Sequence, residues 1–181
     1  MPAAADAEPA ALLRSELARL VAAGAPALDV ACGAGRNALA LARAGVAVIG
    51  LDRDRARLAA LAAAARASAL PVQPVCAELE AGAGLPLASA SCGAVLVFRY
   101  LHRPLAPELI RVLRPGGLLL YETFTEKQRE IAQHPRNPSF LLRSGELLQL
   151  FAGLEVLRCE EALALAPAPE AVARLVARKP G

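Results

Sequence analysis

The chain has 181 residues, 56% of them hydrophobic, and a formal net charge of +3 from 20 Lys and Arg against 17 Asp and Glu. This length suffices for one full core, and the charges are mixed along the sequence, so we predict a single domain over residues 1–181 and find no indication of a nucleic-acid partner. The cysteines show no metal-ligand spacing, no apolar run approaches the roughly 20 residues that span a bilayer, and the first residues do not resemble a signal peptide, so we expect a metal-free, cytoplasmic protein.

Apolar runs alternate with segments of helical periodicity along most of the chain. Residues 1–26 contain leucines at helical spacing and predict one N-terminal amphipathic helix. The predicted strands that follow cover residues 27–31, 46–51, 72–76, 94–98 and 118–122. The predicted helices cover residues 36–44, a segment that begins after the capping residue Asp54, and residues 104–113. This alternation favours a parallel sheet with helices on both faces.

The pattern changes after the fifth predicted strand. Residues 114–117 form an Arg-Pro-Gly-Gly turn into that strand, and residues 123–143 are polar and contain two prolines, which predicts a functional lid. Ser144 can cap a helix that runs to Phe151. Residues 154–159 and 172–179 then predict two closing strands.

The glycines after the first strand indicate a ligand site, because ligands of open α/β sheets bind outside the carboxyl ends of the strands. Gly33 and Gly35 permit a sharp turn and a close approach of the backbone to a ligand, although a purely structural turn has the same signature. The carboxylate of Asp29 would repel a pyrophosphate and attract the amino group or sulfonium of a cationic ligand. This charge favours S-adenosylmethionine over a dinucleotide.

Two acidic residues follow the next strands. Asp52 ends the second strand, at the usual place for a carboxylate that accepts hydrogen bonds from ribose hydroxyls; helix capping, for which Asp54 competes, is the alternative role. Glu78 is positioned to accept a hydrogen bond from an adenine amino group, with Leu79 as an apolar wall, unless Glu78 is simply an exposed loop acid.

Three segments resemble motifs of the class I S-adenosylmethionine-dependent methyltransferases. Residues 28–35 (LDVACGAG) are similar to the first motif, residues 50–52 (GLD) to the acidic second motif, and residues 113–117 (LRPGG) to the turn into the fifth strand. Ala31 replaces the first glycine of many members, a small-for-small change. The narrower resemblance is to small tellurite-resistance-like and small-molecule methyltransferases.

The resemblance implies a doubly wound α/β fold with a mostly parallel seven-stranded sheet and an antiparallel last strand. It also implies S-adenosyl-L-methionine as the cofactor. The cofactor-binding residues that we expect are Asp29, Ala31, Gly33, Gly35, Asp52, Arg53, Glu78, Leu79 and Phe98.

Residues 98–103 (FRYLHR) follow the fourth strand, where methyltransferases of base and protein amino groups carry Asn/Asp-Pro-Pro-aromatic, so a base amine is disfavoured as acceptor. Candidates for catalysis are His102 and Glu122 as bases and Tyr100 as a wall of the acceptor pocket, although each can equally be structural. Candidates for binding an anionic acceptor are Arg99, Arg103 and Arg136, although solvated surface arginines are the default.

These features favour methyl transfer to a small acceptor that is anionic or a soft nucleophile, because no basic face exists to bind a macromolecule. We expect a monomer or homodimer that does not bind membranes. The alternatives are a methyltransferase that acts on RNA or protein with a partner, a non-catalytic S-adenosylmethionine-binding module and a nicotinamide-dependent oxidoreductase; the acidic residue in the glycine motif argues against the last.

Overall fold

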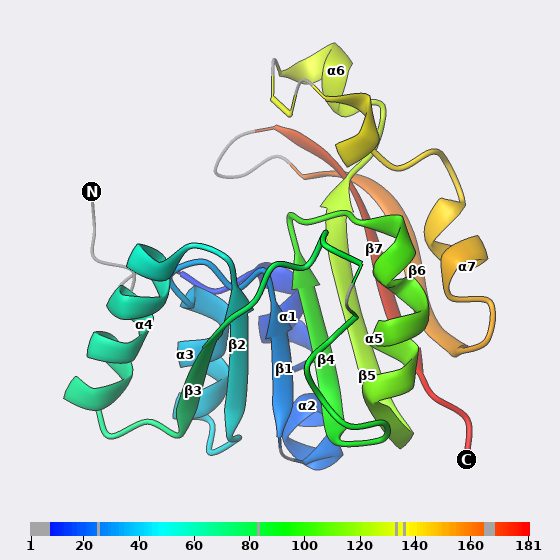
Figure 1. Ribbon diagram of the computed structural model, residues 1–181. Coiled ribbons are helices and arrows are strands. Elements are labelled where there is room, and N and C mark those ends of the chain that lie inside the picture. The colour runs from blue at the N-terminus through cyan, green and yellow to red at the C-terminus, as the bar shows by residue number, and fades with distance from the viewer. Residues whose placement is uncertain (1–7, 25, 83, 133, 136, 165–168) are drawn as a thin grey trace.

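The computed structural model describes residues 8–24, 26–82, 84–132, 134–135, 137–164 and 169–181. Within them, seven strands form one sheet in the order β3-β2-β1-β4-β5-β7-β6 (Figure 1). The strands are β1 (Ala27–Val30), β2 (Val48–Asp52), β3 (Val72–Cys76), β4 (Cys92–Phe98), β5 (Leu113–Phe124), β6 (Glu155–Ala164) and β7 (Glu170–Arg178). The helices are α1 (Ala11–Ser15), α2 (Leu17–Ala23), α3 (Arg36–Arg43), α4 (Arg55–Ala67), α5 (Ala106–Val112), α6 (Gln128–Ile131) and α7 (Glu146–Leu150), with short 3-10 turns η2 (Arg103–Leu105) and η3 (Pro138–Phe140).

Strands β1 to β5 pair in parallel, and β7 runs antiparallel to both β5 and β6. This arrangement confirms the predicted α/β fold with a mostly parallel sheet and an antiparallel last strand. The strand order reverses between β1 and β4, whose carboxyl ends lie side by side. A crevice at such a reversal point is where open α/β sheets bind ligands.

Two apolar layers cover the sheet. Because successive strand residues face opposite sides, Val95 and Val97 of β4 pack toward α5 and α7, whereas Leu96 and Phe98 pack toward α1, α3 and α4. Figure 1 shows these helices on the two faces of the sheet. Burial on both sides explains why β4 is a continuous apolar run.

The N-terminal helix differs from its prediction. The structure has two short helices, α1 and α2, which meet at Glu16 (φ −106°, ψ 7°). The side chain of Glu16 is buried and forms ion pairs with Arg19 and with Arg158 of β6. Hydrophobic periodicity within residues 1–26 cannot predict a contact with a strand so far away in the sequence.

Strand β5 is longer than predicted at both ends. Residues 114–117 are part of β5, and a register shift between Cys92 and Ala94 of β4 accommodates them. The predicted lid segment also begins later, because Thr123 and Phe124 pair with β7. The helix predicted from Ser144 begins at Glu146, since Gly145 is its N-cap and the Ser144 hydroxyl bonds to Glu161 instead.

None of the described helices is long and apolar enough to cross a membrane.

Candidate active site

The carboxyl ends of the two central strands adopt an unusual backbone conformation. Ala31, after β1, has φ of +55° and Arg99, after β4, has φ of +57°. Residues with a Cβ enter this left-handed region at a cost of about 1–3 kcal/mol each, and such strain concentrates at functional sites. Alanine at position 31 is therefore not simply a replacement of one small residue by another, because this backbone conformation favours glycine and alanine adopts it at an energetic cost.

A hollow of about 290 Å³ adjoins the glycine turn. Gly33 (φ +57°) and Gly35 (φ +83°) both lie in the left-handed region, and a Cβ on Gly35 would lie 2.2 Å from a methyl carbon of Leu61. The turn therefore requires glycine at position 35 for conformation and for packing. The predicted residues that line this hollow are Asp29, Ala31, Gly33, Gly35 and Phe98.

Asp29 is a buried carboxylate at the edge of this hollow. It is 2% exposed, and among the described residues its Oδ2 has no hydrogen-bond partner. Burial raises the pKa of Asp29 to about 7, against the opposing effects of the Ala38 amide and Arg36. An orphaned buried oxygen beside a hollow is suited to a ligand that carries a hydrogen-bond donor or positive charge.

Asp52 ties the glycine turn to the end of β2. Its Oδ2 accepts a hydrogen bond from the Gly33 amide at 2.7 Å, and its Oδ1 accepts one from the Asp54 amide at 2.9 Å. Asp54 caps α4 by accepting from the amides of Ala56 and Arg57, so Asp52 is free of that role. Because each carboxylate oxygen has two lone pairs, Asp52 retains acceptor capacity toward a ligand.

A second cavity, of about 310 Å³, lies beside the first hollow. The predicted residues that line it are Ala31, Asp52, Arg53, Glu78, Leu79 and Tyr100. Arg53 and Glu78 form an exposed ion pair at 3.8 Å. Ala31, Arg57 and Arg99 line both spaces, so the two carboxylates, Asp29 and Asp52, flank one continuous region.

Tyr100 lines the second cavity and carries a buried hydroxyl. Its hydroxyl is buried and has no hydrogen-bond partner among the described residues, while its backbone carbonyl accepts from Tyr121 Oη at 3.0 Å. Burial, reinforced by Glu80 and Glu78, raises the pKa of Tyr100 to about 12. Tyr100 therefore stays protonated at neutral pH and can donate a hydrogen bond to a ligand in the cavity.

The two described arginines that we predicted to bind an anion have carboxylate partners. Arg99 forms two hydrogen bonds with Glu170 at 2.5 Å each, and its guanidinium lies 4.9 Å from the centroid of the Phe124 ring. Arg103 forms two hydrogen bonds with Glu146. Arg136 lies outside the described residues. These pairs neutralise the charges that an anionic acceptor would need.

The remaining two candidates lie outside the second cavity. His102 lines a neighbouring groove together with Arg103 and Asn137. Glu122 lies on the opposite face of β5 from Tyr121, because neighbouring strand residues alternate between faces.

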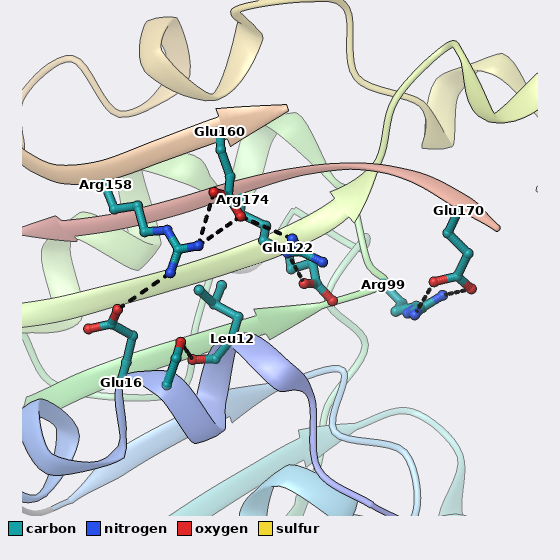
Figure 2. Close-up of polar contacts among 9 residues, drawn as sticks. Leu12, Glu16, Arg99, Glu122, Arg158, Glu160, Glu170 and Arg174 are labelled. Carbon is teal, nitrogen blue, oxygen red and sulfur yellow. Dashed lines mark hydrogen bonds and ion pairs between the residues drawn. The ribbon is translucent and has the colours of Figure 1, made fainter. Parts of the chain in front are cut away.

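Glu122 accepts a hydrogen bond from Arg174 at 2.6 Å, and the ion pairs continue through Glu160 and Arg158 to Glu16 (Figure 2). Glu122 and Glu16 at the two ends of this network are buried, whereas Arg158 is exposed. The ion pair with Arg174 occupies the Glu122 carboxylate and indicates a structural role for it.

Several lining residues were not identified from the sequence. Arg57 lies in the first turn of α4, three residues after the cap Asp54, and lines the hollow beside the glycine turn. Its place just after the predicted cap was the available sequence signal. Glu80, Pro135 and Phe140 also line the second cavity. They come from segments without periodicity, so only the folded structure brings them to the site.

Comparisons with known proteins agree with this geometry. A family model described as a methyltransferase domain matches residues 27–117. No curated protein matches the chain in sequence. Among solved structures, an S-adenosylmethionine-dependent methyltransferase from Methanosarcina mazei aligns with a TM-score of 0.74 at 18% identity and covers 96% of this chain and 99% of its own.

Two further structures show the range of proteins with this fold. The cyclase SpnF aligns with a TM-score of 0.74 at 22% identity, over 93% of this chain and 80% of its own. Geranyl diphosphate C-methyltransferase from Streptomyces coelicolor, solved with S-adenosylhomocysteine, aligns with a TM-score of 0.70 at 15% identity, over 92% of this chain and 80% of its own.

Proposed function

The chain belongs to the class I S-adenosylmethionine-dependent methyltransferases, and we propose that it methylates a small, uncharged acceptor through a soft nucleophilic atom. S-adenosylmethionine is its cofactor. The observation that carries the acceptor proposal is one wall of the second cavity, where Tyr100, whose hydroxyl has no described partner, lies with apolar side chains. The arginines nearest to it in the sequence, Arg99 and Arg103, are already paired.

The residues of the glycine turn fit the cofactor. The orphaned Asp29 oxygen suits its amino group, the turn at Gly33 and Gly35 permits close backbone approach, and Asp52 has lone pairs for its ribose hydroxyls. We propose Phe98 in the first hollow, and Arg53, Glu78 and Leu79 in the second cavity, as further contacts, so the cofactor shares the second cavity with the acceptor. When bound, the cofactor supplies an electrophilic methyl group on a sulfonium, which is transferred by in-line displacement.

The chain's contribution to such a reaction is alignment and exclusion of water. Tyr100 would donate a hydrogen bond to the acceptor, while Leu101, Phe124 and Phe140 surround it with apolar surface. Phe124 ends β5, and Pro135 and Phe140 come from the segment after it and line this cavity, which supports the proposed role of that segment as a lid. No described histidine, lysine or cysteine lines the cavity, which favours an acceptor such as a thiol, a few per cent of which has already lost its proton to water at neutral pH.

Of the two acceptor types suggested by the sequence, the ion pairs favour the soft nucleophile over the anion. An anion would have to displace Glu170 from Arg99 or Glu146 from Arg103, and hydrogen bonds between such charged partners contribute about 1.5–3 kcal/mol each.

The experiment is a screen with isotope-labelled cofactor against uncharged thiols, amines, carboxylates and metalloid oxyanions. We expect methylation of thiols to exceed that of the anions. Faster methylation of carboxylates or oxyanions would contradict the proposal, and label found only in RNA or protein would favour the macromolecular alternative. Tyr100→Phe should lower kcat/KM for the accepted compound about fivefold to tenfold, the effect of one hydrogen bond, without changing the affinity for S-adenosylhomocysteine.

A further inference from the structure

The guanidinium of Arg103 donates hydrogen bonds to the backbone carbonyls of the two residues that flank Phe140. Its Nη1 donates to the carbonyl of Ser139 at 2.8 Å, and its Nη2 donates to the carbonyl of Leu141 at 2.9 Å. The residue between them is Phe140. A single planar side chain therefore holds the peptide group that precedes Phe140 and the peptide group that follows Leu141.

Glu146 holds Arg103 in that orientation. Its carboxylate accepts from Arg103 Nε at 2.6 Å and from Nη2 at 2.9 Å, and it also accepts from the Arg143 amide at 2.8 Å. The side chain of Glu146 is only 6% exposed, so water competes little for this bidentate pair. Arg103 thus has little freedom to turn toward another ligand.

Phe140 is the outer wall of the second cavity. It lines the cavity with Tyr100 and Phe124, and it also lines the neighbouring groove that contains His102. Phe140 is 43% exposed, whereas the following Leu141 and Leu142 are buried. The Leu142 amide donates a hydrogen bond to the carbonyl of Phe124 at the end of β5. Packing anchors the chain after Phe140, but the ring itself has no comparable packing.

We propose that Arg103 is a positioning residue that places Phe140 as the wall separating the acceptor cavity from the groove of His102. This inference rests on the proposed function for its catalytic meaning, because it assigns the cavity to the acceptor. The positioning itself is independent of the acceptor, and so is its primary test.

The primary test uses tryptophan fluorescence, because the chain contains no native tryptophan. Phe140→Trp places one reporter at the wall, and acrylamide quenching measures its exposure. Adding Arg103→Lys preserves the charge but removes the planar fork, so we expect the quenching constant to rise about twofold with a red-shifted emission. Glu146→Gln in the same background should shift the signal in the same direction by less.

Arg111 provides a matched control. It forms an equivalent fork, with two hydrogen bonds to Glu108 and two to the carbonyls of Leu85 and Leu87, far from Phe140 in the sequence. Phe140→Trp with Arg111→Lys should keep the quenching of the parent. An unchanged signal in the Arg103 variant, or an equal change in the Arg111 variant, would overturn the proposal.

Kinetics separate this inference from the proposed function. With an acceptor from the screen, Arg103→Lys in the native background should raise the acceptor KM about tenfold while kcat and S-adenosylhomocysteine affinity stay within twofold. If wild-type protein methylates no small molecule, the proposed function fails while the fluorescence result still decides the role of Arg103. If Arg103→Lys lowers kcat and leaves KM unchanged, a positioning role toward the acceptor is wrong.

Discussion

The two halves of the site are built differently. In the cofactor half, after β1 and β2, the key contact joins Gly33 and Asp52, 19 positions apart, and uses a backbone amide. In the acceptor half, after β4 and β5, Arg99 meets Glu170 across 71 positions and Arg103 meets Glu146 across 43, through side chains. Backbone geometry determines the cofactor half, so few substitutions are tolerated there. Side-chain pairs determine the acceptor half, so substitution of the paired residues can change acceptor specificity while the fold is retained.

Gly35→Ala should break the cofactor half most severely. The new Cβ would clash with Leu61 and adopt an unfavourable φ, which together should lower the free energy of unfolding by about 2–5 kcal/mol. Urea denaturation measures this loss. Gly45→Ala is the control: Gly45 has φ of +88°, and a Cβ added there would have no described atom within 4 Å, so only the backbone strain of about 1–2 kcal/mol should appear. Equal losses in the two variants would show that the Leu61 contact is readily relieved.

Glu122→Gln tests whether this acid belongs to the acceptor half or to the fold. Loss of the charged bond to Arg174 should reduce the free energy of unfolding by about 1.5–3 kcal/mol. Affinity for S-adenosylhomocysteine, measured by calorimetry, should change less than twofold. A variant of wild-type stability that loses kcat would instead identify Glu122 as a base.

Asp52→Ala tests the cofactor half through its affinity for S-adenosylhomocysteine. We expect S-adenosylhomocysteine binding to weaken by about 1–3 kcal/mol, because the ribose acceptors and the anchor of the Gly33 amide are both removed. Asp54→Ala removes the α4 cap and should cost about 1 kcal/mol of stability with little change in affinity. Equal affinities in both variants would leave Asp52 with a structural role only.

Asp29 predicts a pH dependence that is confined to the cofactor half. Its pKa of about 7 means that the buried carboxyl is protonated in mild acid, and a cationic amino group should bind the ionised form. Affinity for S-adenosylhomocysteine should rise about tenfold from about pH 6 to about pH 8, a gain that Asp29→Asn should abolish. A flat profile in wild-type protein would contradict the predicted contact.

Ionisation of Asp29 should strengthen cofactor binding but lower the stability of the fold. The folded pKa exceeds that of the unfolded chain, so the folded state retains the proton longer. The contribution of Asp29 to the free energy of unfolding is therefore fully present below about pH 4 and is lost as the pH rises toward about 7. Urea denaturation of wild-type protein and Asp29→Asn across this range should show a difference that grows with pH.

Much of this protein is determined by its local sequence. The alternation of apolar and helical segments predicted the parallel part of the sheet, because strands buried on both faces are continuous apolar runs. The antiparallel last strand was implied by the family resemblance. The glycine turn and the positions of Asp29 and Asp52 followed from the same local patterns, since a sharp turn after a strand allows few residue types.

The tertiary structure decided the rest. Arg99, Arg103 and Glu122 had suitable charges for binding or catalysis, but their partners come from distant elements, Glu170, Glu146 and Arg174. Local patterns do not identify the partner of a charged side chain, because an ion pair forms between whichever groups the fold brings together. For the same reason, Phe140 lines the site only because the fold brings residues 137–142 back to the end of β5.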